Sequence, residues 1–371
     1  MRLLIVTEIP APYRIPLFNA LAAEPGVDPC VAFLAEHDPR RSYRVYREEF
    51  AFREVVLPGR SVVRGRRWLV LSRGVLRLLR RVKPDVIVVG GWNQPAFWQV
   101  LLAGRVFRRP TLLWVESTAA DARSNAALTV GLRRLALRLA SGFLVPGRAS
   151  RDYLRSLGVD DGRIFDAPNA VDVGVFGERV RNERTDLAAL RERLSLGGCV
   201  FLYVGRLEAE KGPDVLVSAM AEVPAELVLI GSGSLEPELR AGAGERVRFV
   251  GHLARDGLVP WYAAADCLVV PSRSDTWGMT LNEGAAAGLP LVATDVVGGA
   301  HDLIEPGVNG YRVPAENPSA LADALRAVAT DGAFRRRAGH RSRELARRFT
   351  PEAWAAGVVS AARAASRRSG G

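Results

Sequence analysis

The chain has 371 residues, of which 48% are hydrophobic and 25% charged, and its formal net charge is +11. This hydrophobic content excludes an intrinsically disordered protein, and the length allows two domains that each have a core. The sequence contains no run of about 18 apolar residues that could span a membrane. The apolar segment within residues 1–12 is too short for a secretory signal and predicts a first buried strand.

The three cysteines, Cys30, Cys199 and Cys267, lie in or beside apolar runs, without a CxxC motif or a neighbouring histidine. We therefore expect buried thiols, no metal site and a cytoplasmic protein. The charge is uneven, because residues 1–175 hold 27 Lys and Arg against 16 Asp and Glu, whereas the remainder is balanced. This basic half contains no zinc, RNP-type or basic-arm motif, so we do not expect a nucleic-acid partner.

Short apolar runs alternate with amphipathic helical patterns along the whole chain. Six runs fall in the first half, at 2–7, 30–34, 54–58, 85–90, 111–116 and 142–146. Six more follow, at 199–205, 226–231, 247–251, 267–271, 290–294 and 310–314. Buried runs separated by helices predict parallel sheets covered on both faces. Two such sets predict an α/β protein with two Rossmann-like, doubly wound domains that bind ligands at the carboxyl ends of their strands.

The basic half contains two stretches with helical periodicity, at 66–83 and 128–140. In the first stretch, the residues expected to face the core are Leu71, Val75, Leu78 and Leu79. In the second, the expected apolar stripe consists of Leu128, Leu132, Leu135 and Leu139. A packed helix with a solvated charged face explains both patterns. The alternative is that the positive surface attracts anionic lipid, at about 1 kcal/mol per basic residue near a membrane.

Two polar segments of the first half follow apolar runs and could contact a ligand. Tyr13 and Arg14 lie in a proline-rich loop after the first run, and Trp92 and Asn93 follow the fourth. We consider all four as candidate acceptor-binding residues. The alternatives are an ordinary loop cation for Arg14 and a capping Asn beside a packed Trp for the other pair.

The motif VGRLEAEKG, at 204–212, follows an apolar run and contains Arg206 and Lys211. The sequence has two lysines, Lys83 and Lys211, so a lysine at this place suggests that a point charge is needed. Fixed cations stabilise the negative charge that develops on a leaving nucleoside diphosphate. The alternative is a solvated surface lysine. Farther along, Gly231 begins GSGS after another run and either approaches the nucleotide or forms a tight turn.

The most informative stretch, residues 271–290, follows a predicted strand at 267–270 and predicts a polar loop and a short helix before the next strand. Gly278 leaves bare backbone where the helix begins, so the amides of Met279 and Thr280 can meet a phosphate. Glu283 carries a carboxylate that can accept hydrogen bonds from two ribose hydroxyls, and Asp275 can accept hydrogen bonds from hydroxyls of a sugar. These residues together predict a nucleotide-sugar site.

The acid-x7-Glu pattern from Asp275 to Glu283 and the GRLxxxKG element resemble the donor-binding motifs of glycosyltransferase family 4, whose members are retaining enzymes of the GT-B fold. The opening PAPYRIPLFNAL is similar to that of polysaccharide-type members. The resemblance implies two domains facing a cleft. Residues 1–175 with a returning helix at 351–366 would bind the acceptor, and residues 176–350 would bind the nucleotide sugar.

The resemblance also implies an activity: transfer of a sugar from a nucleotide-diphosphate sugar, UDP rather than GDP, to a hydroxyl acceptor with retention of anomeric configuration. It implies no metal and no other cofactor. Arg206 and Lys211 would clamp the diphosphate, Glu283 the ribose and Asp275 the sugar. The expected roles are cell-envelope polysaccharide or glycolipid synthesis and natural-product glycosylation. The acceptor is expected to be lipid-linked or anionic, and the protein peripheral to the inner face of the plasma membrane.

Two positions depart from the family pattern. The family usually has Glu at both ends of the acid-x7-Glu pattern, whereas this chain has the shorter Asp275. Many members carry a histidine after the fifth strand of the first domain, and the equivalent here is Glu116. Glu116 could stabilise positive charge at the anomeric carbon or accept a proton, or it could be a helix cap or part of a structural ion pair. These departures leave a catalytically silent, nucleotide-sugar-binding relative as the alternative function.

Overall fold

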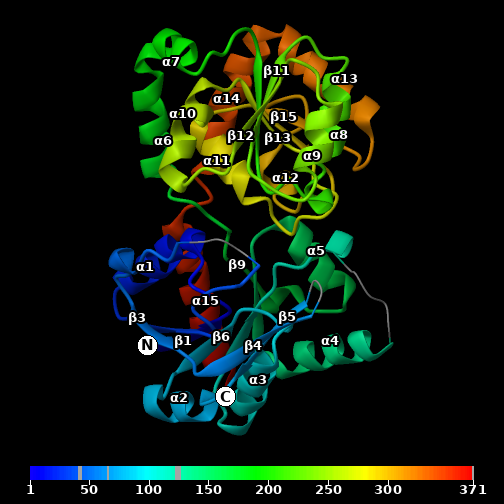
Figure 1. The fold of residues 1–371 in the computed structure, drawn as a ribbon. Coiled ribbons are helices and arrows are strands. Elements are labelled where there is room, and N and C mark those ends of the chain that lie inside the picture. The colour runs from blue at the N-terminus through cyan, green and yellow to red at the C-terminus, as the bar shows by residue number, and fades with distance from the viewer. Residues whose placement is uncertain (41–43, 65–66, 122–126, 370–371) are drawn as a thin grey trace. The chain divides into compact units, whose positions relative to one another are not determined.

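The structure, a computed structural model, describes residues 1–40, 44–64, 67–121 and 127–369. The chain forms two compact units (Figure 1). The first unit comprises residues 1–146, 150–170 and 351–371, and the second comprises residues 147–149 and 171–350. Each unit is built around one parallel sheet that is covered by helices, as the sequence predicts.

The sheet of the first unit has seven strands in the order β3-β2-β1-β6-β7-β8-β9, and every neighbouring pair is parallel. Its strands, in chain order, are β1 (Arg2–Thr7), β2 (Asp28–Phe33), β3 (Arg53–Val56), β6 (Val86–Val89), β7 (Thr111–Trp114), β8 (Gly142–Val145) and β9 (Ile164–Asp166). An antiparallel hairpin of β4 (Gly59–Arg64) and β5 (Arg67–Ser72) is separate from the sheet.

The helices of the first unit cover both faces of this sheet. They are α1 (Ile15–Ala23), α2 (Val75–Val82), α3 (Pro95–Val106), α4 (Ala127–Leu139), α5 (Arg148–Ser156, whose first two residues belong to the second unit) and α15 (Pro351–Ser369). Along β1, Leu4 and Val6 join the core under α2 and α3, whereas Leu3 and Ile5 join the core under α1 and α15. Both faces are therefore apolar, because helices cover each of them.

Helix α15 completes the core of the first unit although it follows the second unit in the sequence. Trp354 is fully buried, and its ring centroid lies 5.2 Å from that of Trp114 and 5.8 Å from that of Phe18. A side chain at Gly357 would meet the backbone oxygen of Asp166 at 2.0 Å, so glycine allows α15 to approach β9 closely.

The second sheet has six parallel strands in the order β12-β11-β10-β13-β14-β15. They are β10 (Val200–Val204), β11 (Glu226–Ile230), β12 (Val247–Gly251), β13 (Cys267–Val270), β14 (Leu291–Thr294) and β15 (Gly310–Val313). One face is covered by α6 (Val173–Glu183), α7 (Leu187–Arg193), α10 (Arg255–Ala264), α11 (Met279–Ala287) and α12 (Ala300–Leu303). The other face is covered by α8 (Pro213–Met220), α9 (Glu236–Gly242) and α13 (Pro318–Thr330).

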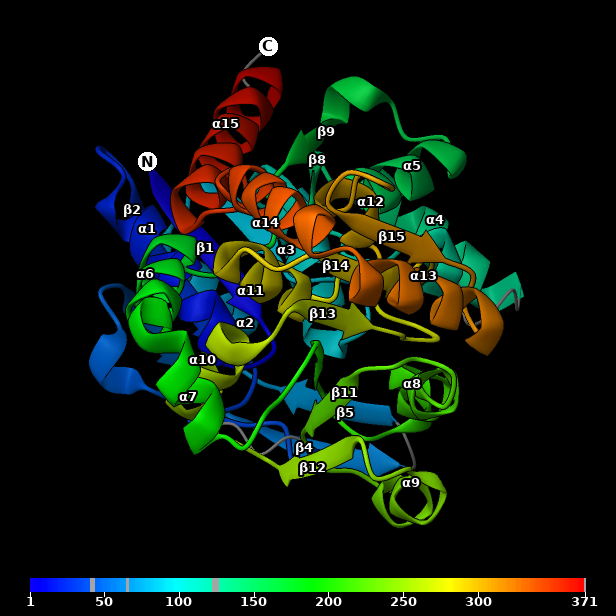
Figure 2. The same cartoon turned by 90° about the horizontal axis from the view of Figure 1, so that it is seen from above.

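Helix α14 (Gly332–Ala346) follows α13 and contributes buried side chains to the cores on both sides of the second sheet. It also packs against α11. Figure 2, seen from above, shows α13 beside β15 and α14 beside α11.

All twelve predicted strands are confirmed, but the predicted helix at 66–83 is wrong in its first part. Residues 67–72 form β5, whose alternation buries Trp68 and Val70 and exposes Leu71 instead of packing it in the core. Gly74, with φ of 86°, separates this strand from α2, in which Val75, Leu78 and Leu79 are buried as expected. The left-handed conformation at Gly74 prevents one continuous helix.

The predicted leucine stripe at 128–140 is also wrong in part. Helix α4 forms, but Leu132 and Leu135 are each 44% exposed, and the buried residues are Ala136 and Leu137. The side chain of Leu128 lies outside the described part. The helix is thus rotated relative to the sequence pattern and presents leucines at the surface.

Candidate functional site

Both sheets reverse their strand order at a central pair of strands. In the first sheet the reversal falls between β1 and β6, and in the second between β10 and β13. The loops that leave the carboxyl ends of such a pair diverge to opposite sides and leave room for a ligand. The candidate residues of the second unit follow β10, β11 and β13, and those of the first unit follow β1, β6 and β7.

The loop after β10 carries the two cations of the GRLxxxKG element. Arg206 forms an ion pair with Glu210 and is 52% exposed. The Nζ of Lys211 lies 2.6 Å from the Oδ2 of Asp275, and these side chains are 23% and 17% exposed. The structure therefore brings Lys211 and Asp275 together from two loops that are 64 residues apart. Because the pair is mostly shielded from water, its attraction is stronger than that of a surface ion pair.

Asp275 also shapes the start of helix α11. Its Oδ1 accepts a hydrogen bond from the backbone amide of Gly278 at 3.0 Å. Gly278 has φ of 82°, a conformation that favours glycine, and it turns the chain into the helix. The amides of Met279 and Thr280 follow in the first turn, where no preceding helical carbonyl is available to them. This end of the helix is therefore suited to an anion.

Glu283 lies in the second turn of α11, and its carboxylate accepts a hydrogen bond from the hydroxyl of Tyr262 on α10. Burial raises the pKa of Glu283, although the hydrogen bond from Tyr262 acts in the opposite direction. Burial, together with the negative charge of Glu283, raises the pKa of Tyr262 well above its ordinary value. Tyr262 thus remains a hydrogen-bond donor that holds the carboxylate in place. Tyr262 could not be predicted from the sequence, because nothing in residues 255–264 signals a partner 21 residues away.

Close backbone contacts hold the loop after β11 against the loop after β10. A side chain at Gly231 would meet the backbone oxygen of Gly205 at 1.8 Å, and the φ of Gly231 is 143°. Ser234 donates from its amide and its hydroxyl to the carboxylate of Glu208, at 2.9 and 2.8 Å. Glu208 is a second residue that the sequence analysis missed, since its partner depends on how two loops meet.

In the first unit, Arg14 and Glu116 meet at the ends of β1 and β7. The Nη2 of Arg14 lies 3.1 Å from a carboxylate oxygen of Glu116, and its Nη1 donates to the hydroxyl of Thr7 at 2.7 Å. The guanidinium also lies 4.5 Å from the ring centroid of Trp114. Burial, the largest single effect, lowers the pKa of Arg14, but the nearby charges of Glu116, Tyr13 and Glu8, together with the hydrogen bond to Glu116, raise it overall. Glu116 is therefore a fixed carboxylate, 27% exposed, beside a permanent cation.

The other candidates of the first unit are more structural. Asn93 donates to the carboxylate of Glu8 at 2.8 Å, and Gln94 donates to the same oxygen at 2.9 Å. Trp92 packs against the core, and its backbone oxygen accepts from Trp98. Tyr13 lies beside Arg14, whose guanidinium carbon is 5.8 Å from the tyrosine ring centroid.

No group of three or more His, Cys, Asp or Glu residues able to hold a metal ion occurs among the described residues. Within the same part of the chain, no helix has the length and apolar character needed to cross a membrane.

Two family models match the chain, one in each unit. The model described as Glycosyl transferase 4-like domain matches residues 13–170, and that described as Glycosyl transferases group 1 matches residues 198–331. Both matches agree with the resemblance drawn from the donor motifs.

Curated relatives carry a related name. The chain is 37% identical over 232 residues to a D-inositol 3-phosphate glycosyltransferase of Xylanimonas cellulosilytica, covering 59% of this chain and 55% of that protein. It is 32% identical over 274 residues to the protein of the same name from Nocardia farcinica, covering 68% and 58%. The chain thus spans about half the length of the curated relatives it matches.

Solved structures share the fold over nearly the whole chain. Anabaena HepE in complex with UDP superimposes with a TM-score of 0.77 at 20% identity, covering 97% of this chain and 99% of that one. Sucrose-phosphate synthase from Thermosynechococcus elongatus gives 0.75 at 21% identity, covering 97% and 98%. The chain therefore has the GT-B fold of glycosyltransferases. Its two family matches support a GT-B glycosyltransferase related to family 4.

We expect Glu283→Gln to raise the midpoint of thermal unfolding at about pH 8. The fold raises the pKa of this carboxyl, so ionisation of Glu283 costs stability as the pH rises through the folded-state pKa. This increase in the midpoint of thermal unfolding should shrink as the pH falls to about 4, where the carboxyl of Glu283 is protonated in the folded protein. Differential scanning fluorimetry across this range measures it.

The matched control is Glu238→Gln on α9, an exposed carboxylate that forms no hydrogen bond or ion pair among the described residues. This variant should leave the midpoint nearly unchanged at every pH. An equal effect of Glu283→Gln at both ends of the pH range would contradict the assignment of a buried, destabilising carboxylate.

Proposed function

We propose that the protein is a glycosyltransferase that moves a sugar from a UDP-sugar to a hydroxyl acceptor with retention of anomeric configuration. The observation that carries this proposal is the arrangement at the strand reversal of the second sheet. There, Lys211 is paired with Asp275, and Asp275 orders the start of the helix that carries Glu283. A cation, an anion-binding helix start and two carboxylates are what a sugar nucleotide requires.

Each group has a proposed role in holding the donor. Lys211 and Arg206 neutralise the diphosphate, whose negative charge grows as it leaves. The amides of Met279 and Thr280 donate to phosphate oxygens, while Gly231 lets the backbone come close to the nucleotide. In the proposed complex Tyr262 holds the carboxylate of Glu283, which accepts hydrogen bonds from the ribose hydroxyls. Asp275 accepts hydrogen bonds from hydroxyls of the transferred sugar. Asp275 is one methylene shorter than glutamate, so it selects the sugar by its shorter reach.

The preference for UDP over GDP rests on the solved neighbours. Structures of Anabaena HepE are described in complex with UDP, with UDP and glucose, and with UDP-glucose. They cover 97% of this chain, which supports the same class of donor here.

We expect UDP to raise the midpoint of thermal unfolding more than GDP, and UDP-hexoses to release UDP slowly in the presence of the protein. Lys211→Ala should reduce the shift and slow UDP release by about 10²–10³-fold, because one cation that stabilises the leaving group is lost. Fluorimetry and a coupled UDP assay measure the two effects.

The matched control is Lys83→Ala, which removes the other lysine of the sequence, at the end of α2 in the first unit. Full UDP release by Lys211→Ala would contradict the clamp. Binding of UDP without turnover of any UDP-hexose by the wild type would favour the catalytically silent alternative, which the names of the matched relatives do not favour.

Glu116 is proposed to act at the reacting carbon. Its carboxylate stabilises positive charge that develops at the anomeric centre or accepts the acceptor proton, and Arg14 fixes its position. Tyr13, Arg14, Trp92 and Asn93 are the proposed acceptor contacts. The curated relatives are named for D-inositol 3-phosphate, which supports an acceptor that carries both hydroxyls and negative charge.

Glu116→Gln should lower the rate of UDP release by about 100-fold while leaving the UDP-induced thermal shift intact, since the charge is lost but the donor site is not touched. The control Glu36→Gln removes an exposed carboxylate of the same unit. Undiminished turnover in Glu116→Gln would show that the carboxylate is only a structural partner of Arg14.

A basic and apolar surface of the first unit is proposed to bind anionic membrane lipid. Its exposed apolar side chains are Val62, Val63, Leu69 and Leu71 on the hairpin, Leu76 on α2, Leu102, Val106 and Phe107 at α3, and Leu132 and Leu135 on α4. Helix α3 packs against β5, α2 and α4, so these elements are contiguous. The excess positive charge of the chain lies in this half. Such a surface would serve a lipid-linked acceptor and peripheral attachment.

The double variant Leu69→Glu/Leu71→Glu should sediment several-fold less with phosphatidylglycerol vesicles than the wild type, because it replaces apolar contacts by like charge. The control Val308→Glu changes an exposed valine of the second unit. Equal sedimentation of wild type with neutral and anionic vesicles at low salt, or no loss in the double variant, would overturn this surface.

A further inference from the structure

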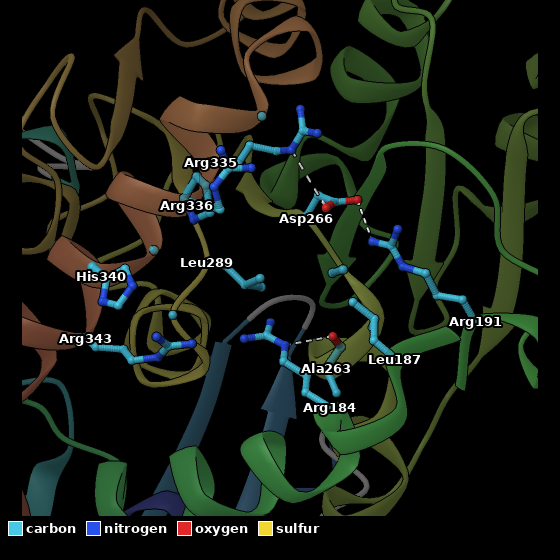
Figure 3. A pocket seen from close by; sticks show the side chains of 15 residues that line it. Arg184, Leu187, Arg191, Ala263, Asp266, Leu289, Arg335, Arg336, His340 and Arg343 are labelled. Atoms are coloured by element: carbon cyan, nitrogen blue, oxygen red, sulfur yellow. Dashed lines mark hydrogen bonds and ion pairs between the residues drawn. The ribbon is translucent and has the colours of Figure 1, made fainter. Parts of the chain in front are cut away.

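A pocket of the second unit lies at the edge of its sheet that is opposite to the proposed donor residues. The pocket has a volume of about 340 Å³, and its lining includes Asp266, immediately before β13, and Leu289, before β14. The donor residues follow the carboxyl ends of the strands, whereas this pocket lies at their amino ends. Figure 3 shows its side chains, which come from residues 184–191, the end of α10, the residues just before β13, the segment after α11 and helix α14.

The pocket is strongly basic. Five arginines line it, Arg184, Arg191, Arg335, Arg336 and Arg343, together with His340, against one acidic residue, Asp266. Figure 3 shows the guanidinium groups of Arg184 and Arg343 pointing toward one another. Burial, and then the charge of Arg343, lower the pKa of Arg184 to about 10. Positive charges are thus held close together with too little negative charge to balance them.

Structural roles account for three of these arginines. Arg184 donates to the backbone oxygens of Tyr262, Ala263 and Ala287, at 3.0, 2.9 and 2.6 Å, and so caps the ends of α10 and α11. Arg191 and Arg335 lie 2.7 and 3.8 Å from Asp266.

The other basic groups, Arg336, His340 and Arg343, have no hydrogen bond or ion pair within the described part of the chain. They lie four and three residues apart on α14, a spacing that places them on one face of a helix. The Nε of Arg343 is buried without a partner. A side chain at Gly288 would meet this Nε at 2.3 Å, so the guanidinium is packed on the end of α11. A shielded cation without a counterion is unfavourable, and a bound anion would offset that cost.

We propose that this pocket binds a small phosphate-bearing molecule, with Arg336, His340 and Arg343 contacting the phosphate and Arg184 contributing charge. Guanidinium groups match phosphate oxygens in geometry as well as charge. The volume lies at the lower end of that of small-molecule sites, so the pocket holds more than a bare phosphate ion. The site is separate from the proposed donor site, because helix α11, about 13 Å long, separates Gly288, which lines the pocket, from the first turn at the donor loop.

The test is isothermal titration of inorganic pyrophosphate into the full-length protein. The double variant Arg336→Gln/Arg343→Gln should weaken binding at least ten-fold. The matched control Arg337→Gln/Arg347→Gln removes the same charge from exposed arginines at α14 that do not line the pocket, and it should bind like the wild type. Circular dichroism of each variant checks its folding.

Lys211→Ala separates this site from the donor site. Pyrophosphate binding that survives Lys211→Ala and is lost in Arg336→Gln/Arg343→Gln supports the pocket, whether or not the protein transfers sugar. The proposed pocket would be overturned if Lys211→Ala abolished pyrophosphate binding while Arg336→Gln/Arg343→Gln retained it. It would also be overturned if the wild type did not bind pyrophosphate. Binding confined to phosphatidic acid vesicles, and lost in the same double variant, supports the site and assigns its phosphate to a lipid headgroup instead of a soluble molecule.

Discussion

The burial of both sheets on both faces is the constraint from which the rest of the structure follows. A parallel strand covered by helices on each side disfavours charged side chains along its length, and the central strands β6, β7, β8, β10, β13 and β14 contain none. The charged groups next to these strands therefore lie at the strand ends, where loops leave the sheet. At the central reversal of the second sheet, Lys211 and Asp275 arrive from different loops and meet at 2.6 Å. In the first sheet, Arg14 and Glu116 likewise meet at 3.1 Å from loops that follow β1 and β7.

Several arginines of the chain bind backbone carbonyl oxygens. Arg184 binds three carbonyl oxygens, and Arg248 and Arg335 each bind two. The planar guanidinium suits binding to several carbonyl oxygens, because its donors reach more than one acceptor at once. Lysine, a compact point charge, is found at Lys211 beside a carboxylate. A compact lysine at this position agrees with the interpretation that a point charge is needed there.

Much of the fold could be predicted from the sequence because the strands are short, continuous runs of apolar residues bounded by polar loops. The prediction failed where two periodicities compete. In RWLVLS, alternation places Trp68 and Val70 inside and Leu71 outside, yet the following leucines of α2 extend a helical pattern over the same residues. Gly74 was the available signal for the boundary. The partner contacts of the site, Tyr262 with Glu283 and Glu208 with Ser234, depend on tertiary packing and leave no local trace in the sequence.

The position of α15 has a consequence for synthesis on the ribosome. Residues 351–369 are translated after the whole second unit, yet Trp354 fills the core beside Trp114 and Phe18. The second unit is continuous from residue 171 to 350, so nearly all of it can fold as it emerges. The first unit, although made earlier, exposes the face under α15 until the last helix has left the ribosome. The nascent chain must therefore carry an incomplete first domain through the time needed to make about 180 further residues, at roughly 5–20 residues per second.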